Sequence, residues 1–499
     1  MRLLIYAALF CCAFTAHAAR AQTIERVVRV APPRAGASRY VYVPFGVPRG
    51  ARRVAVSYSY EREGGANTID IGVFDARSSG SDTDPRGFRG WSGGRRSEFF
   101  ITRYEATPGY LPGPLPAGTW HVILGLYKVA PSGVDVKLRL DIETGGITAG
   151  RPAARGSEIL LPRETGRHRR TAGPNLFWLA GDMHMHTVHS DGDWTVHELA
   201  KAAYYSYLDF IFVTDHNTSS HHADVDRVGG IPRELLVLRG EEITTYGGHT
   251  NAWGLPAGAW VDFRVRPGNS SRMSEVAARA HSLGALVSVN HPFAACGGCD
   301  WSYAGALNDF DAIEVWNGEW DLTDERALKL WDGLLQRGLR PTAVASSDSH
   351  RAQNPIGRPT THAAASELSQ VALLRGIRGG RVYLTRGADG PAFDFEAAAG
   401  EVGPRGLSGP RHTFGEELRL RSPGTLVFFI RALGAPPRSV ISLVSGGRVV
   451  RTFKAQSQLT EVFEVECERD AYYRLEVRDP AGAMLAMTNP IYVKVGGRR

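Results

Sequence analysis

The feature that most constrains the fold of this chain is a regular alternation, between residues 176 and 391, of short apolar runs with helix-period segments. The apolar runs have the length of strands buried on both faces, and they cover residues 177–180, 210–213, 235–238, 285–289, 312–316 and 342–345. Helices are expected between them, at 195–207 with a capping box of Thr195 and Glu198, at 272–283 and at 324–337. Such βα alternation predicts a parallel sheet or a barrel.

The segments on either side have the pattern of β-structure instead. Apolar and polar side chains alternate over residues 54–60 and 134–142, and again over 440–450, where Gly446 and Gly447 separate two expected strands. A chain of 499 residues also exceeds the ~250 to 300 residues that one core supports. We therefore expect a multidomain α/β plus all-β protein. Its expected units are an N-terminal β-sandwich at 22–144, a linker at 145–175, the α/β unit at 176–391 and a C-terminal, immunoglobulin-like β-sandwich at 392–499.

The first 21 residues have the features of a secretory signal peptide. Arg2 precedes an apolar stretch at residues 3–14, and small residues then end at Ala18 or Ala21. The stretch is too short to span a bilayer, and no later run of ~18 apolar residues follows, so no transmembrane segment is expected. The sequence thus predicts export through a cleaved signal peptide, to the periplasm or the outside.

The basic charge of the chain is scattered. The formal net charge is +7, but outside residues 163–170 the basic side chains form no block. A nucleic-acid partner, which would need a basic stripe along its phosphates, is not expected. The sequence also has no phosphate-binding loop of the Gly-x-x-x-x-Gly-Lys type and no Gly-x-Ser-x-Gly nucleophile motif.

Histidines gather in the α/β segment, where 11 of the 16 lie between residues 181 and 350. His184 and His186 directly follow an apolar strand, and they share one face because side chains alternate along a strand. Other apolar runs end in the same kind of residue: Asp215-His216-Asn217, Glu241-Glu242, His291 and Asp348-Ser349-His350, with Asp191 and His249 in nearby loops. Since the carboxyl ends of parallel strands meet at one mouth, this recurrence predicts a metal site.

These motifs, in this order, resemble the PHP (polymerase and histidinol phosphatase) superfamily over residues 176–391. Within it, the run from Gly240 to Asn251, the run from Glu314 to Gly318 and the β-flanked layout resemble the CehA/McbA-like metallohydrolases. The resemblance implies a distorted (β/α)7 barrel that binds two to three divalent ions at the carboxyl-end mouth.

The resemblance also implies which residues bind each ion. The first ion would be held by His184, His186, Glu242 and Asp348; the second by Glu242, His249 and His291; the third by Asp191, His216 and His350. Imidazole and carboxylate ligands suit Zn, Mn or Fe, and the choice among them stays open. Glu241 is an alternative to Glu242. Asp182, Asp215 and Asn217 either orient the imidazoles or make strand-end and turn hydrogen bonds.

Other residues around these motifs are candidates for substrate binding or for stiffening the site. Arg351 and Arg386 could bind anions through their forked guanidinium groups, or simply lie on the surface, and Asn317 could line the pocket. In an exported protein Cys296 and Cys299 favour a local disulfide over free thiols, which would leave Cys467 unpaired.

The leading hypothesis is an exported metal-dependent hydrolase acting on a small-molecule substrate. Ions that share Glu242 and are held by Asp348 would activate water, and Arg351 would neutralise charge on an anionic substrate. Phosphoesters, either diesters or monoesters, are the expected substrates. The alternatives are a carbamate, amide or carboxylic ester hydrolase with the same site, and a non-enzymatic surface or glycan-binding adaptor with a structural metal centre.

Overall fold

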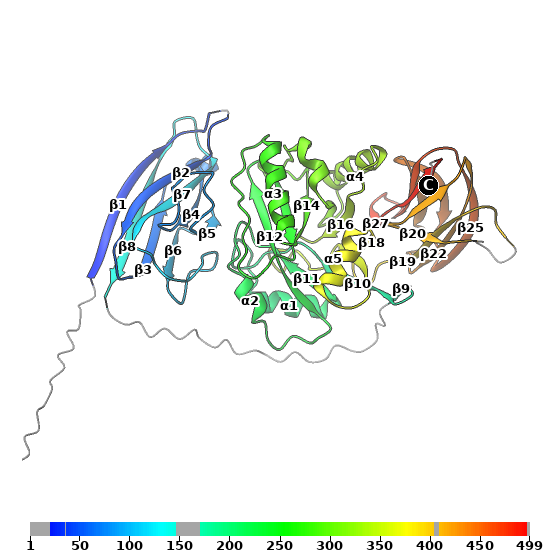
Figure 1. The fold of residues 1–499 in the computed structure, drawn as a ribbon, viewed down its shortest axis with the longest axis horizontal. Coiled ribbons are helices and arrows are strands. Elements are labelled where there is room, and N and C mark those ends of the chain that lie inside the picture. Colours follow the sequence, from blue (N-terminus) through cyan, green and yellow to red (C-terminus); the bar gives the residue numbers. More distant parts are fainter. Residues whose placement is uncertain (1–19, 35, 146–169, 404–408, 497–499) are drawn as a thin grey trace, which may run out of the picture.

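The computed structural model describes residues 20–34, 36–145, 170–403 and 409–496. The chain is mostly β and multidomain, with a β-sandwich at one end, a mixed unit in the middle and a second β-rich unit at the other end (Figure 1). The predicted signal peptide at 1–21 and the linker at 145–175 lie largely outside the described residues. Within the described ranges, no helix is both long and apolar enough to cross a membrane.

Two four-stranded sheets build the N-terminal unit. One has the order β1-β8-β3-β6 and the other β2-β7-β4-β5. In β8 every second side chain from Val134 to Ile142 is buried, as the alternation predicts. The bounds are β1 (Arg20–Val30), β2 (Tyr40–Val47), β3 (Ala51–Ser59), a 3-10 turn (Glu63–Gly65), β4 (Thr68–Phe74), β5 (Phe88–Gly93), β6 (Glu98–Thr102), β7 (Gly118–Lys128) and β8 (Val134–Thr144).

In the central unit, a strand overlaps each of the six predicted apolar runs, and the three predicted helices form. Thr195 and Glu198 make the predicted capping box. The strands are β9 (Thr171–Gly173), β10 (Leu176–Asp182), β11 (Phe210–Val213), β12 (Leu236–Thr245), β13 (Gly248–Trp253), β14 (Leu286–Asn290), β15 (Ala312–Asn317), β16 (Thr342–Ser346), β17 (Thr360–Ala365) and β18 (Val382–Thr385). The helices are α1 (Val196–Tyr205), α2 (His222–Asp226), α3 (Ser270–Ser282), a 3-10 helix (Ala304–Asp309), α4 (Leu322–Gln336) and α5 (Gln370–Arg378).

The topology of the central sheet departs from strict βα alternation. Neighbouring strands are parallel from β10 to β12 and from β14 to β16, but β13 pairs antiparallel with both β12 and β14. The reason is local, because the turn at Tyr246–Gly247 between β12 and β13 is too short for a crossover helix. The backbone pairing of the described strands does not join β16 to β17, so the predicted (β/α)7 barrel is not shown. The side chain of Thr361 bridges them, through bonds to Ala345 N and O.

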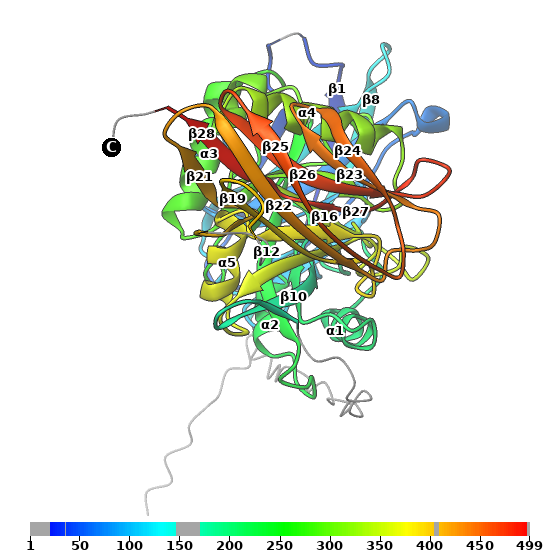
Figure 2. The ribbon, with the colours of Figure 1, turned by 90° about the vertical axis from the view of Figure 1, so that its right-hand side faces the viewer.

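The C-terminal unit has two layers, and one of them continues the central sheet. The separate layer has the order β20-β19-β22-β25, while β18 pairs with β27 and extends the central sheet through β26, β23 and β24. Figure 2 shows this unit in front of the central one. The predicted hairpin at Gly446 and Gly447 forms, and the immunoglobulin-like type stays a prediction. The bounds are β19 (Ala392–Ala399), β20 (His412–Thr413), β21 (Glu417–Leu420), β22 (Gly424–Leu433), β23 (Val440–Ser445), β24 (Arg448–Lys454), β25 (Gln458–Cys467), β26 (Ala471–Arg478), β27 (Met484–Thr488) and β28 (Ile491–Val495).

An aromatic contact joins the N-terminal sandwich to the loops of the central unit. Phe88 stacks on Trp260 with ring centroids 4.0 Å apart, and Trp91 packs on Phe263 at 4.7 Å. Trp260 also donates through Nε1 to the backbone oxygen of Asn217, at 3.2 Å. Because Asn217 follows His216, this contact holds a loop beside the predicted metal ligands.

Candidate metal centre

The nine predicted ligands come from strand ends and adjoining loops of the central unit. Isolated parallel β-bridges pair Met185 with Ser349 and His216 with Glu242. They hold together the segments that carry the ligands. The ligands are placed as follows: His184 and His186 after β10, Asp191 before α1, His216 after β11, Glu242 in β12, His249 in β13, His291 after β14, and Asp348 and His350 after β16.

Glu242 lies at the middle of this arrangement and is fully buried. Its Oε1 atom is 3.3 Å from His184 Nε2 and 3.2 Å from both His249 Nδ1 and His291 Nε2. Its Oε2 atom is 2.7 Å from His216 Nδ1. Its Oε2 atom also lies 3.6 Å from His186 Nε2, so one carboxylate contacts five imidazoles, which is the arrangement expected of a bridging ligand.

Two further carboxylates, Asp348 and Asp191, contact imidazoles of the same cluster. Asp348 Oδ1 lies 3.4 Å from His184 Nε2 and 3.1 Å from His186 Nε2. Asp191 Oδ1 lies 3.4 Å from His216 Nε2 and 3.2 Å from His350 Nε2. The structure thus brings Asp348 to the first predicted ion and Asp191 to the third.

The ligand atoms fall into groups that are compact enough to hold a metal ion. Three of these groups match the predicted ions: His184, His186 and Glu242; Glu242, His249 and His291; and Asp191, His216 and His350 together with His186. Two other groups were not predicted: His184, His291 and Glu314; and His249, Cys296 and Cys299.

The hydrogen-bonding state of these atoms fits divalent ions. His184 Nε2, His186 Nε2, Asp191 Oδ1 and Asp348 Oδ1 are buried, and within the described residues none has a hydrogen-bond partner. Leaving a buried polar atom unsatisfied costs about 1–3 kcal/mol, so four facing one another are hard to explain without a ligand. Nitrogen and oxygen atoms in such sets suit Zn, Mn or Fe.

The electrostatics keep the carboxylates charged and one imidazole neutral. Burial would raise the pKa of Glu242, but His184, His216 and His249 hold that pKa well below its usual range. For Asp348, too, burial is outweighed by imidazoles, chiefly those of His184 and His186, and its pKa is well below the ordinary value. Burial, with His350 and His216, lowers the pKa of His186 to about 4. Ionised carboxylates and neutral imidazole are the forms that bind metal. The neighbouring carboxylates outweigh burial and raise the pKa of His184 and, to about 9, the pKa of His216, so an ion would displace a proton from each of these two rings.

Glu314, in β15, is a functional residue that the sequence reasoning did not assign. Its Oε1 lies 3.1 Å from His184 Nδ1, and its Oε2 accepts from His291 N at 2.9 Å and from Asn317 Nδ2 at 3.0 Å. By binding Nδ1, Glu314 turns His184 so that Nε2 faces Glu242 and Asp348. A signal existed, because Glu314 interrupts an otherwise apolar strand.

Asp182, Asp215 and Asn217 mainly bind the backbone and hydroxyl groups around the ligands. Asp182 accepts from Ser347 N at 3.1 Å and from Gly357 N at 2.8 Å. Asp215 accepts from Thr187 N and Oγ1 and from Ser190 Oγ, and Asn217 pairs through its amide with the backbone of Thr244. These are strand-end and turn hydrogen bonds, and one of them also reaches a ligand ring, because Ser190 Oγ, which donates to Asp215, lies 3.4 Å from His186 Nδ1. The orienting role stays a prediction.

Backbone strain also concentrates here. His291, Asp348 and Asn217 have φ angles of 25°, 52° and 54°, a region that side chains with a Cβ rarely adopt. Such conformations cost about 1–3 kcal/mol each, and persist where the surroundings require the position.

The predicted substrate-binding residues differ in their availability. Arg351 is exposed beside His350. Arg386 pairs with Glu319 at 3.2 Å, and the Asn317 amide points to Glu314 and, at 3.5 Å, to Asp348 Oδ2. Cys296 and Cys299 form a disulfide, while Cys467 is free and buried.

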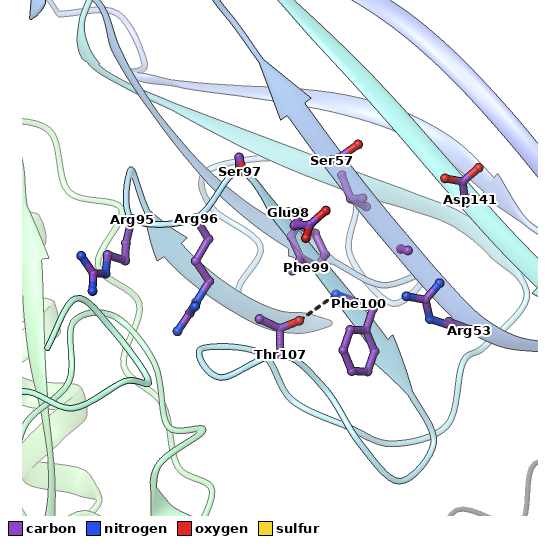
Figure 3. Close-up of a pocket in the computed structure, with 12 residues that line it drawn as sticks. Arg53, Ser57, Arg95, Arg96, Ser97, Glu98, Phe99, Phe100, Thr107 and Asp141 are labelled. Carbon is purple, nitrogen blue, oxygen red and sulfur yellow. Dashed lines mark hydrogen bonds between the residues drawn. The ribbon is translucent and has the colours of Figure 1, made fainter. Parts of the chain in front are cut away.

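A cavity of about 550 Å³ lies apart from these ligands, on the N-terminal unit. Its lining comes from β3, β6, β8 and the loops beside β6, and includes Arg53, Phe100 and Asp141 (Figure 3). Arg95, also in the lining, pairs with Asp193 of the central unit at 2.8 Å. The lining includes none of the nine predicted ligands, so this cavity is not the mouth of the metal centre.

No family model and no curated protein matches the chain. Among solved structures, it is similar to a two-domain protein from Bacteroides vulgatus that contains a predicted PHP-like metal-dependent phosphoesterase. The identity is 19% and the TM-score 0.38, and the match covers 68% of this chain and 100% of that one. It is also similar to an amidohydrolase from Chromobacterium violaceum with bound sulfate and no metal, at 16% identity and a TM-score of 0.26, over 36% of this chain and 90% of that one. Since both TM-scores are below 0.5, we base the function on the side chains.

Proposed function

We propose that this protein is a metal-dependent hydrolase with a multinuclear centre. The observation that carries the proposal is Glu242, one buried carboxylate in contact with imidazoles from four separate chain segments. Divalent ions held by the nine ligands would supply Lewis acidity and water of lowered pKa. No protein nucleophile is needed for such a reaction.

The residues of the chain contribute charge and orientation. Glu242 and Asp348 stay ionised beside their imidazoles, and Glu314 sets the orientation of His184. Arg351, exposed and next in sequence to His350, is the group that would pair with a substrate oxyanion.

The charge of the predicted substrate-binding side chains favours a phosphodiester over a phosphomonoester as substrate. Of the three predicted substrate-binding side chains, Arg386 and Asn317 are already bound to carboxylates. The single guanidinium of Arg351 matches the one negative charge of a diester better than the two of a monoester. Carbamate, amide or carboxylic ester cleavage with the same metal site is the alternative, for which no guanidinium is required.

The test combines metal analysis with a small substrate panel. The purified protein should contain two to three equivalents of Zn, Mn or Fe and should cleave an aryl phosphodiester faster than an aryl phosphomonoester. Faster cleavage of an aryl carbamate or ester would establish the alternative. The adaptor alternative predicts a different result. The protein would bind metal but cleave none of these substrates, and Asp348→Asn would not change its affinity for any ligand that it binds.

We further propose that the central unit is a distorted (β/α)7 barrel of the PHP, CehA/McbA-like type. A separate proposal is that the chain is exported to the periplasm or the outside. Strand β1 begins at Arg20. Cleavage after Ala18 would leave β1 whole, whereas cleavage after Ala21 would remove its first two residues. The mass of the secreted chain distinguishes the two sites, and a chain that keeps its first 18 residues would argue against export by cleavage.

A further inference from the structure

The Cys296–Cys299 disulfide lies directly against one of the predicted metal ligands. Cys299 Sγ is 3.9 Å from both ring nitrogens of His249. The ligand atoms of His249, Cys296 and Cys299 all lie within 4.8 Å of one another. In the oxidised state the two sulfur atoms are bonded to each other and cannot act as thiolate ligands.

The two sulfur atoms differ in their access to solvent. Cys296 is exposed, whereas Cys299 is buried at 4% exposure beside His249. A reductant in solution can therefore reach the Cys296 sulfur and not the Cys299 sulfur. Attack on Cys296 releases Cys299 as the leaving thiolate, next to the imidazole.

The loop that carries both cysteines is closed by bonds other than the disulfide. Trp301 N donates to Pro292 O at 3.0 Å, and Ser302 N donates to Gly247 O at 2.8 Å. From the N-terminal sandwich, the Tyr127 hydroxyl donates to the backbone oxygen of Cys296. After reduction these bonds would keep both thiols beside His249.

We propose that Cys296, Cys299 and His249 form a second, reducible metal site of thiolate and imidazole chemistry, which shares His249 with the carboxylate-bridged centre. A dithiol reductant attacks Cys296 Sγ, forms a mixed disulfide and releases Cys299. Its second thiol then displaces Cys296, so the reductant becomes a disulfide and the protein gains two electrons and two protons. The two thiols lose these protons when an ion such as Zn²⁺ binds.

The new site would compete with the proposed hydrolytic centre, a consequence that rests on the proposed function. His249 Nδ1 lies 3.2 Å from Glu242 Oε1, so the same imidazole serves both groups. When His249 is drawn to the thiolates, the ion shared by Glu242 and His291 loses a ligand. Reduction should then lower hydrolysis while the total metal content is maintained.

The test uses Co²⁺ as the probe on the full-length folded protein. The protein is reduced with dithiothreitol, freed of excess reductant without oxygen and titrated with Co²⁺. The number of reactive thiols should rise by two, and a sulfur-to-cobalt charge-transfer band should appear. The oxidised protein should lack the band, as should the variant with both Cys296→Ser and Cys299→Ser. Cys467→Ser removes the one other cysteine of the described chain and should leave the band unchanged.

Several outcomes would overturn the proposal: two new thiols without a charge-transfer band, an equal band in the double variant, or a disulfide that resists reduction until the protein unfolds. The readout does not depend on turnover. A band in a protein that hydrolyses nothing would support this site and contradict the proposed function, and hydrolysis without a band would do the opposite.

Discussion

Two adjacent carboxyl groups, Glu241 and Glu242, have opposite environments because side chains alternate along β12. Glu242 faces the imidazoles, whereas Glu241 accepts from Val261 N at 2.9 Å, and burial raises its pKa well above the usual value. Glu242→Gln should lower bound metal and turnover by more than the ~10 to 100-fold that follows loss of a group supporting a ligand. Glu241→Gln, the matched control, should retain both. Elemental analysis and turnover measure this, and equal losses in the two variants would show that Glu242 has no special role.

Glu314 should act through His184 rather than on substrate. Glu314→Gln keeps the size of the side chain but lets the Nδ1 position of His184 change its protonation, so metal affinity should fall about 10 to 100-fold. Glu319→Gln alters a nearby exposed carboxylate and should have little effect. A metal titration of both variants is the measurement. If Glu314→Gln lowered turnover without weakening metal binding, a direct role in the reaction would replace the positioning role.

At this scale the sequence predicted the ligands at strand ends better than their support. His184, His216 and Asp348 follow apolar runs, and the carboxyl ends of neighbouring strands must meet, so their convergence follows from chain geometry. Glu314 was not assigned, because a carboxylate inside an apolar strand gives no indication of what lies across from it. The hydrogen-bond partners of Asn317 could not be predicted either, because they depend on the orientation of its side chain, which the spacing of residues in the sequence does not determine.

At the scale of elements, the N-terminal sandwich contributes a buried carboxylate to its contact with the β12–β13 turn. Asp70, in β4, accepts from the Tyr246 hydroxyl at 2.7 Å, and burial raises the pKa of Asp70 to about 7. Between about pH 4 and pH 7 the folded chain keeps a proton that the unfolded chain has released, so this group lowers stability as pH rises. The shift from 3.8 to about 7 corresponds to roughly 4 kcal/mol.

Asp70→Asn removes that titration and keeps an oxygen for Tyr246. The variant should match the parent chain in free energy of unfolding near pH 4 and become the more stable of the two above pH 7. Urea unfolding of both proteins at the two pH values measures the difference. A difference that did not change with pH would mean that Asp70 is ionised in the folded protein throughout.

Among the elements of the central unit that the sequence analysis did not predict, which also include β17, β18, α2 and α5, β13 changes the topology most. Gly247 and Gly248 fall within the run from Gly240 to Asn251, and two glycines between runs of β-forming residues are a hairpin signal. In the structure Gly247 lies in the turn and Gly248, at φ 133°, begins β13. Helices and parallel strands were predictable because their periods are local. The pairing of the strands was not predictable, because it depends on which neighbouring strand the β12–β13 hairpin packs beside.

For the whole molecule, a buried ion pair ties the C-terminal unit to the central one. Arg474, in β26, lies 2.7 Å from Asp332 of α4 and 2.6 Å from Glu476, and its side chain is 1% exposed. Arg474→Met would leave the buried carboxylate of Asp332 without its cation, while Glu476 would keep Arg478 at 2.8 Å, and the change should cost roughly 3–5 kcal/mol. Arg431→Met breaks a half-exposed pair with Asp394 and should cost about 0–1 kcal/mol.

Denaturant unfolding of both variants checks this prediction. Because β18 and β27 share backbone bonds, the central and C-terminal units should unfold in one transition in the parent protein. If Arg474→Met unfolded the C-terminal unit alone, with the central unit unchanged, the two would be independent despite their common sheet.

The aromatic contact between Phe88 and Trp260 has a consequence for how the chain is made. Tyr40, Phe74 and Trp91 also belong to the core of the central unit, so these rings leave the ribosome long before the residues that cover them. During synthesis the N-terminal sandwich exposes these aromatic side chains until the central unit folds against them. Any delay in translating the central unit would prolong the risk of aggregation. A truncated chain ending at Thr144 should therefore bind a hydrophobic dye strongly, and the same fragment with Phe88→Ser and Trp91→Ser should bind it weakly.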